Sequence, residues 1–207
     1  MADGMILPIV KYGHPALRQK GARVERVDAD IRQLVSDMLD TMYEADGVGL
    51  AAQQVGQSLQ LAVLDIRGVT ERPSTLVLDG KEADPESIMP LVLINPEVKA
   101  VGEPVAGAEG CLSFPQIYAD VVRPESVEVR ATNLDGRTTL FRCGGLLAKA
   151  VQHEVDHLNG ILYIDRMTRT VKAEIKAELE LLMEDTKAVL EGAERRKSVK
   201  ARERKPR

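Results

Sequence analysis

The stretch VQHEVDHLNGILY, Val151 to Tyr163, contains two of the three histidines in this chain. His153 and His157 are four positions apart, so on a helix they share one face and both imidazoles can reach a single ion. Glu154 stands beside them, close enough to handle the proton of a metal-bound water. This pattern requires a helix that faces another segment of the chain, because two histidines alone do not complete a metal site.

The third ligand determines the class of site. Gly160 fits the extended zinc-peptidase pattern H-E-x-x-H-x-x-G-x-x-H, but Tyr163 stands where the last histidine would be. His14, the remaining histidine, precedes a proline, and we interpret it as a turn residue. Downstream glutamates stay open as ligands of an H-E-x-x-H zinc metallopeptidase, which is the alternative function: Glu174, Glu178 and Glu180.

The upstream segment AEGCLSFP offers a better third ligand, Cys111. A thiolate with two imidazoles gives three protein ligands and leaves a fourth position for water, the pattern of a catalytic metal. Gly110, directly before it, allows close backbone approach. A free cysteine is more often a buried apolar residue, and we assign that role to Cys143.

Composition limits the remaining choices. The 207 residues suffice for one domain, and with only 3% aromatic residues and no Trp the core must be aliphatic. The net charge of −4 gives no reason to expect specific DNA binding, although the end of the chain, Glu194 to Arg207, is basic. The sequence shows no secretory signal and no membrane-spanning run, so we expect a cytoplasmic protein with no membrane partner.

The periodicity predicts an α+β fold. A helix is expected over residues 28–47, capped by Asp28 or Asp30, with one apolar stripe. Buried strands are expected at residues 59–66 and 90–96, separated by a turn-rich surface excursion over 67–87. Residues 126–141 predict a hairpin that turns at Asp135-Gly136. Helices follow over 145–163 and 172–191.

The segment GVGLAAQQVG, Gly47 to Gly56, lacks the Lys-Ser/Thr of a phosphate-binding loop. It is either a glycine-rich helix cap and turn, or a stretch of bare backbone against a substrate, with Gln54 as an uncharged donor.

Three segments together resemble the peptide deformylase family. Its motifs G-x-G-x-A-A-x-Q, E-G-C-L-S and Q-H-E-x-D-H stand at residues 47–54, 109–113 and 152–157, in the family's order. The resemblance covers roughly residues 5 to 170. It implies mixed or antiparallel strands around a central helix that carries the metal motif, in a catalytic domain over 1–170. A C-terminal helix over 171–190 and a basic, flexible tail over 191–207 would follow.

By position, the resemblance implies that Cys111, His153 and His157 bind one divalent ion, natively Fe(II), with Zn(II) or Ni(II) in preparations. It implies that Glu154 is the general acid/base of a hydrolysis driven by metal-bound hydroxide. Gln54 and the backbone N–H of Leu112 would stabilise the oxyanion. The motif alignment, rather than chemistry, selects Gln54 over Gln53.

The implied substrate is an N-formylmethionyl nascent polypeptide, which releases formate. The resemblance places the methionine side chain against Val48 and the helix face of Leu146, Ala150 and His153. The peptide backbone would pair beside Gly47 to Gly49 and with the strand after Cys111, as an added strand, and Gly110 would also contact the substrate. The C-terminal helix and basic tail would contact the ribosome.

Three further residues receive specific predictions. Asp156 points away from the metal on a regular helix, and we predict that it orients a neighbouring segment through Arg123. Tyr118 stands where many relatives carry arginine, at the rim of the peptide groove. Lys149 lies close to the methionine pocket, where its stem can cover the pocket edge.

Overall fold

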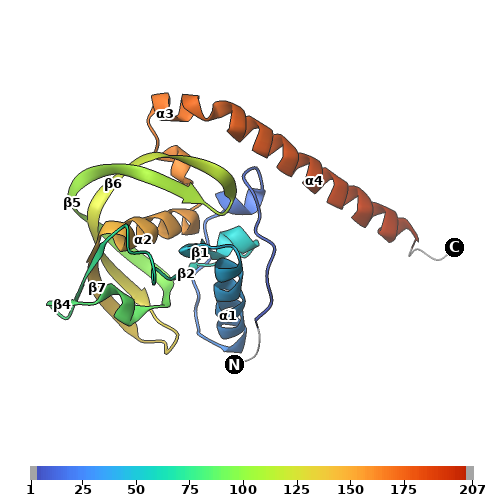
Figure 1. The fold of residues 1–207 in the computed structure, drawn as a ribbon. Coiled ribbons are helices and arrows are strands. Elements are labelled where there is room, and N and C mark those ends of the chain that lie inside the picture. The colour runs from blue at the N-terminus through green and yellow to red at the C-terminus, as the bar shows by residue number, and fades with distance from the viewer. Residues whose placement is uncertain (1–3, 204–207) are drawn as a thin grey trace.

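In a computed structural model, which describes residues 4–203, an antiparallel sheet bends around one central helix (Figure 1). The α-helices are α1 (Ala29–Glu44), α2 (Gly145–Leu158), α3 (Arg169–Glu174) and α4 (Lys176–Glu203). Single 3-10 turns are η1 (Pro15–Arg18), η2 (Ala52–Val55), η3 (Pro85–Ile88) and η4 (Tyr163–Asp165). The fold is α+β, as predicted.

The strands form one sheet in the order β1-β2-β5-β6-β7-β3-β4, and each neighbouring pair is antiparallel. Their bounds are β1 (Gly49–Ala51), β2 (Leu61–Leu64), β3 (Ser74–Leu78), β4 (Lys81–Ala83), β5 (Leu91–Cys111), β6 (Phe114–Thr132) and β7 (Thr138–Gly144). The neighbouring pairs β2–β5 and β7–β3 are not consecutive in the chain. The chain therefore crosses from one side of the sheet to the other between β2 and β3, and crosses back between β4 and β5.

Strands β5 and β6 form a long hairpin, here called the β5–β6 arm, which positions Cys111 of the E-G-C-L-S motif. They pair from Ile94↔Thr132 to Cys111↔Phe114, with register shifts between Ile94/Glu97, Val101/Pro104 and Glu109/Cys111. Such bulges bend a strand and increase its twist. The arm therefore curves over α2 (Figure 1), and Cys111, the last residue of β5, arrives next to that helix.

Helix α2 is the centre of the fold. It contacts β1, β2, β3, β5, β6 and β7, and its buried residues extend around most of its surface. A helix that is apolar on most sides must be enclosed on most sides. It ends at Leu158, and Gly160 then adopts a left-handed φ of 70° against the backbone of Arg18.

Helix α1 confirms the predicted apolar stripe and cap. The Asp28 side chain accepts a hydrogen bond from the N–H of Ile31 at 3.1 Å, and Val35, Met38 and Met42 are buried. They pack against β1, β2 and the beginning of β5 in a core of aliphatic residues. The predicted 126–141 hairpin is also confirmed, since β6 and β7 are joined at Asp135-Gly136.

Residues 67–87 correct the sequence-based expectation. Instead of a surface excursion only, they contain the hairpin of β3 and β4, and β3 pairs with β7 inside the sheet. Leu76 is 2% exposed and belongs to the core around α2. The turn residues that flank this short strand on both sides concealed its alternating pattern. The strand predicted over 90–96 likewise continues, through its bulges, to Cys111.

The C-terminal helix is longer than predicted. Helix α4 continues to Glu203 rather than ending near residue 190, and residues 204–207 of the predicted tail lie outside the described residues. Leu179 packs with Phe114 and Tyr163, whereas Leu181 and Val189 are exposed. Beyond its first turns, α4 projects away from the body of the molecule (Figure 1).

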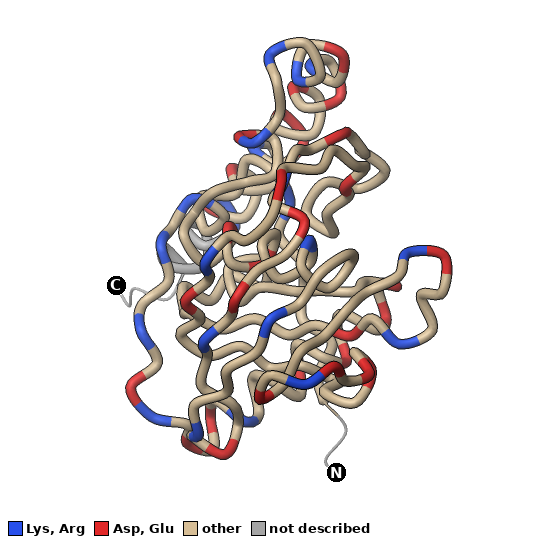
Figure 2. Tube along the Cα trace, turned by 90° about the vertical axis from the view of Figure 1, so that its left-hand side faces the viewer, with Lys and Arg blue, Asp and Glu red and all other residues tan. Residues whose placement is uncertain are grey.

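Charges of both signs are interspersed along the described trace (Figure 2). Within residues 4–203, no helix combines the length and the hydropathy that a membrane span needs.

Candidate metal centre and active site

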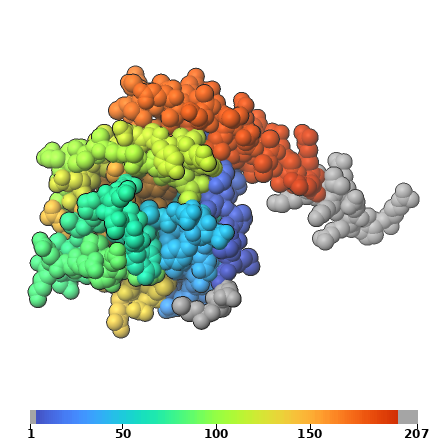
Figure 3. Space-filling view, viewed as in Figure 1, coloured from blue at the N-terminus to red at the C-terminus, as the bar shows by residue number. Residues whose placement is uncertain are grey.

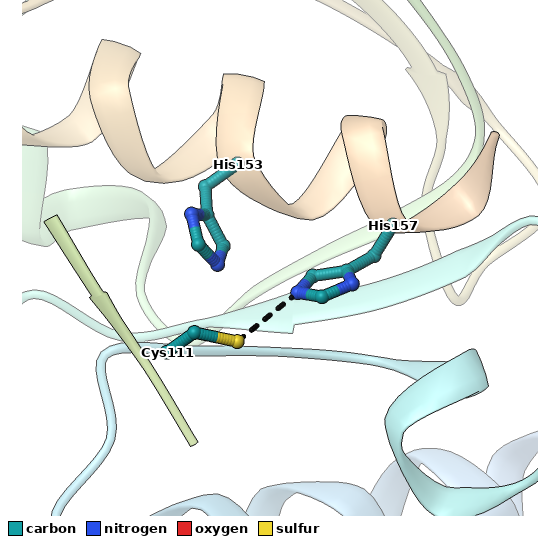
Figure 4. Close-up of side chains that lie close together, drawn as sticks. All are labelled: Cys111, His153 and His157. Carbon is teal, nitrogen blue, oxygen red and sulfur yellow. Dashed lines mark hydrogen bonds between the residues drawn. The ribbon is translucent and has the colours of Figure 1, made fainter. Parts of the chain in front are cut away.

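Cys111, His153 and His157 converge from two elements (Figure 4). One ligand atom from each lies within 4.8 Å of the other two, and Sγ of Cys111 is 3.3 Å from Nε2 of His157. The helical spacing of α2 turns both imidazoles toward the end of β5, where the bulged arm presents the thiol. One sulfur and two imidazole nitrogens at these separations fit a divalent transition-metal ion.

A buried carboxylate orients the first imidazole. Nδ1 of His153 lies 3.1 Å from Oε2 of Glu109, which makes Nδ1 the donor and leaves Nε2 for the centre. Burial would lower the pKa of His153, but hydrogen bonds with Cys111 and Glu109 raise it well above its usual value. Burial would raise the pKa of Glu109, but hydrogen bonds from His153 and Arg123 hold it at about 2.

Arg123 joins this carboxylate to the helix. Its guanidinium donates to Glu109 at 2.6 and 2.9 Å and to Oδ2 of Asp156 at 2.7 Å, and all three side chains are buried. The predicted contact between Asp156 and Arg123 is therefore confirmed. Arg166 adds a second guanidinium at 2.6 Å from Oδ1 of Asp156. The two guanidinium groups and the two carboxylates neutralise one another's charges, at a buried position where an unpaired charge would destabilise the fold.

Glu154 lies on the same helix and faces the groove. It is buried, and its Oε2 has no hydrogen-bond partner among the described residues. Burial raises the pKa of Glu154 to about 7. A Cβ at Gly49 would collide with Oε1 of Glu154. Only a residue without a side chain leaves the carboxylate room at this approach, which explains one glycine of the Gly47–Gln54 motif.

The structure distinguishes the two adjacent glutamines. Oε1 of Gln54 accepts a hydrogen bond from the N–H of Ala51 at 2.8 Å, so its amide nitrogen faces Sγ of Cys111 at 3.5 Å and Oγ of Ser113 at 3.3 Å. Gln53 points elsewhere and donates to the carbonyl of Leu158 at 3.3 Å. Gln54 is thus the one that presents a neutral donor to the centre.

Leu112 occupies the tight turn between β5 and β6. The N-terminal segment fixes this turn from outside, because Nζ of Lys11 donates to the Leu112 carbonyl at 2.8 Å and the N–H of Tyr12 donates to the Ser113 carbonyl at 2.9 Å. Contacts from residues far apart in the chain therefore hold the Cys111 thiol and the adjacent backbone in place.

A groove of about 550 Å³ opens onto these groups. In Figure 3 it corresponds to the hollow between the β5–β6 arm and the part of the chain around α1, with α2 at its base. Its lining contains all the residues predicted to contact substrate: Gly47, Val48, Gly49, Gly110, Leu146 and Ala150. Leu112, Gln54 and Glu154 line it as well, with Tyr118 and Lys149 at the rim.

The other candidate ligands lie outside this centre. Nδ1 of His14 accepts from the N–H of Ala16 at 3.2 Å, which confirms it as a turn residue. In the part of the chain that the structure describes, the one cluster of three potential ligands excludes Glu174, Glu178 and Glu180. Cys143 is buried in the core around α2, as predicted, and burial raises its pKa to about 12.

Comparisons with known proteins agree with this geometry. The family model described as polypeptide deformylase matches residues 6–173. The chain belongs to the peptide deformylase family. A peptide deformylase of Opitutus terrae is 45% identical over 186 residues, 89% of this chain and 96% of the relative. One of Methylacidiphilum infernorum is 48% identical over 176 residues, 85% of this chain and 92% of the relative.

Solved structures of the family share the fold. A plant peptide deformylase aligns with a TM-score of 0.72 and 42% identity, over 85% of this chain and 88% of that one. A peptide deformylase from Synechococcus elongatus in complex with actinonin aligns at 0.69 and 38%, over 90% and 91%. The protein is accordingly a metal-dependent hydrolase that deformylates nascent peptides, and the zinc metallopeptidase alternative is not favoured.

Sequence reasoning missed two residues of the site. Glu109 was noted only as the first residue of the E-G-C-L-S motif, without a role of its own. Arg166 was not singled out. The acid two positions before Cys111 was a usable signal, because metal-bound histidines commonly donate their second N–H to a carboxylate. Arg166 stands in a loop without any distinguishing pattern.

Proposed function

We propose that Cys111, His153 and His157 hold one divalent ion, natively Fe(II), and that Zn(II) or Ni(II) can replace it. The convergence of these three side chains on one groove, with Glu154 and Gln54 beside them, carries the proposal. Thiolate and imidazole ligands suit iron and zinc alike. A bound ion would supply a Lewis acid that lowers the pKa of a coordinated water to about 7.

Glu154 is the general acid/base. Its carboxylate takes the proton of the attacking water and returns it to the amine that leaves, since that amine cannot depart as an anion. Its burial supports this role, because a pKa of about 7 suits a group that must both accept and donate a proton near neutrality. Gly49 leaves room for the carboxylate itself, because a Cβ at this position would collide with Oε1 of Glu154.

Gln54 and the N–H of Leu112 stabilise the oxyanion that forms on the formyl oxygen. The bond from Ala51 holds the Gln54 amide in one orientation before substrate arrives, so no reorganisation is needed during the reaction. Loss of one such donor costs on the order of 3 kcal/mol of transition-state stabilisation.

The methionine side chain enters the groove between Val48 and the α2 face of Leu146 and Ala150. Among the described residues, the Gly107–Gly110 stretch of β5 pairs with β6 on one edge and has no strand on the other. An extended peptide can pair with that open edge and with the backbone of Gly47 to Gly49. The site admits a formyl hydrogen and excludes an acetyl methyl.

The test separates metal binding from catalysis. Glu154→Gln keeps the three ligands, so anaerobic metal analysis should give a full complement of ion while formate release from formyl-Met-Ala-Ser falls by about 10²- to 10⁴-fold. Glu128→Gln, on the surface of β6, is the matched control and should retain both. Full activity in Glu154→Gln would contradict the assigned role.

The remaining assignments concern the chain outside the groove. Residues 1–170 form the catalytic domain, the protein acts in the cytoplasm, and the C-terminal helix with the basic tail contacts ribosomal RNA where formylated chains emerge. The projection of α4 away from the body supports that contact. Deletion of the residues after Leu190 should weaken ribosome co-sedimentation in a salt-dependent way, and unchanged co-sedimentation would remove the idea.

A further inference from the structure

Two cationic side chains line the same wall of the groove without a carboxylate partner. Lys149 and Arg72 both border the cavity, and among the described side chains neither forms an ion pair. Lys149 is half-buried, and burial lowers its pKa, while Glu109 raises it and Arg72 lowers it. Arg72 is exposed. Two like charges near each other, one of them half-buried, favour an anion between them.

None of the nearby carboxylates is an anion that lies between Lys149 and Arg72. Glu109 is already engaged by Arg123 and His153, and Glu154 is buried beside the metal ligands. Asp46 lies in the loop that follows α1, away from the β5 wall. Asp120 is exposed on β6, and it acts on Lys149 through its charge without forming an ion pair with it.

The backbone of β5 positions both cations. Nζ of Lys149 lies so close to Gly107 that a Cβ there would collide with it, so the glycine lets the ammonium lie across the strand. Arg72 donates to the carbonyl of Ala108, the next residue, at 3.5 Å. Leu146 and Ala150, on either side of Lys149 in the helix, line the methionine pocket.

The position of these cations defines which part of a substrate they meet. Gly107 and Gly110 are three residues apart, about 10 Å along an extended strand. A peptide that pairs with the open edge of β5 therefore passes Lys149 and Arg72 within two residues of its formylmethionine. We propose that Lys149 and Arg72 form a carboxylate-recognition site that favours formylmethionyl peptides with Asp or Glu as the second or third residue.

This inference rests on the peptide path proposed above, and its test compares isosteric peptides. Formyl-Met-Asp-Ala-amide is paired with formyl-Met-Asn-Ala-amide, and formyl-Met-Ala-Asp-amide with formyl-Met-Ala-Asn-amide. The terminal amide removes the only other carboxylate from each peptide. In the wild-type enzyme, kcat/KM should favour the acidic member of at least one pair by about three- to fivefold, the effect of an ion pair at a partly exposed site. The preference should shrink at about 0.5 M salt.

Variants assign the preference to these two residues. Lys149→Met and Arg72→Gln should each bring the acidic-to-amide ratio, measured within the variant, toward one. Lys99→Met, which removes a lysine paired with Glu128 on the distal part of the β5–β6 hairpin, should leave the ratio as it is in the wild type. A wild-type ratio of one for both pairs, or a ratio unchanged in Lys149→Met and Arg72→Gln, would overturn the proposal.

A binding experiment keeps this inference separate from the catalytic proposal. In metal-loaded Glu154→Gln, calorimetry on the same formyl peptides measures the dissociation constant without turnover. Tighter binding of the acidic peptide supports the site even if the catalytic roles proposed above are wrong. Equal binding of both members in both pairs counts against it even if the enzyme is fully active. Free formate, the product anion, is added as a competitor. If millimolar formate abolishes the preference in kcat/KM, and calorimetry shows no tighter binding of the acidic peptides, the site binds the product rather than the substrate. The proposal then fails.

Discussion

Nδ1 of His153 lies 3.1 Å from the carboxylate of Glu109, which itself stands two positions before Cys111, the proposed thiol ligand. One short segment of β5 therefore supplies a proposed metal ligand, Cys111, and also the carboxylate that accepts from Nδ1 of His153 and fixes the tautomer of this imidazole. The two histidines of α2 are not equivalent in this respect, because Nδ1 of His157 has no hydrogen-bond partner among the described residues.

This relationship predicts the effect of Glu109→Gln. The amide cannot compensate Arg123 and accepts more weakly from His153, so metal affinity should fall by about 10- to 100-fold. Competition with a chelator measures the change. The surface variant Glu128→Gln should hold its metal as the wild type does, and an unaltered affinity in Glu109→Gln would show that the carboxylate has no influence on the ion.

The two cysteines allow a matched comparison. Cys111→Ala removes the thiol from the centre and should abolish stoichiometric metal binding together with formate release. Cys143→Ala shortens a buried side chain in the core around α2, and its cost should appear as a lower free energy of unfolding, by about 1 kcal/mol, with the metal retained. Metal analysis and thermal unfolding of both variants check this. Retention of metal by Cys111→Ala would argue for the H-E-x-x-H peptidase arrangement.

Gly49→Ala tests the space around Glu154, the proposed general base. The added methyl group would collide with Oε1 of Glu154, so the carboxylate must turn away from the position that it now holds. We expect kcat to fall by about 10²-fold, comparable to a misplacement of 1 Å at the reacting groups, with the metal content unchanged. Gly192→Ala, where a Cβ would meet its nearest neighbour at 3.8 Å, serves as the control. Wild-type kcat in Gly49→Ala would mean that Glu154 can work from another position.

Asp165 links the N-terminal segment to the turn after α2, and its effect should depend on pH. Burial would raise its pKa, but hydrogen bonds from Arg18 and from the N–H of Leu162 lower it below the usual 3.8. A depressed pKa contributes stability above pH 3.8, and this stability is lost as pH falls further. Asp165→Asn should therefore lower the free energy of unfolding by about 0.5 to 1 kcal/mol at pH 7, since the pair is partly exposed.

Urea unfolding at several pH values measures this difference. The gap between wild type and Asp165→Asn should close as the pH is lowered through and below 3.8. Asp185→Asn, an exposed residue of α4, should show no such gap. A gap that widens on acidification would mean that the ion pair with Arg18 does not stabilise the fold.

Local sequence patterns were sufficient to predict those features of the fold and the site that depend on residues close together in the chain. The spacing of His153 and His157 fixed their common helix face, and the apolar stripe of α1 fixed its buried side. The contact between Asp156 and Arg123 had a different basis. A helix that presents its histidines to a metal must point the intervening acid elsewhere, toward an arginine of a neighbouring segment, but no sequence pattern selected Arg123 among the arginines.

The sequence could not predict the register in which distant strands pair. The bulges in β5 decide that Cys111 arrives beside α2 and that Lys149 lies over Gly107, and a bulge leaves little trace in the local sequence. The β3 strand was missed for a related reason, because its stability comes from pairing with β7 rather than from its own short pattern. The end of α4 was misplaced because a mostly polar helix has no periodic apolar boundary.

The sulfur and the second imidazole that face each other are 46 positions apart in the chain. An unfolded or half-synthesised chain cannot bring them together, so ion capture must wait until translation has passed His157 and the β5–β6 hairpin has closed. The free energy of unfolding then depends on the supply of the ion in the cell. Free metal at about a hundred times its dissociation constant raises the free energy of unfolding by about 2.7 kcal/mol. Metal starvation would consequently deplete this enzyme through degradation of unfolded chains as well as through loss of activity.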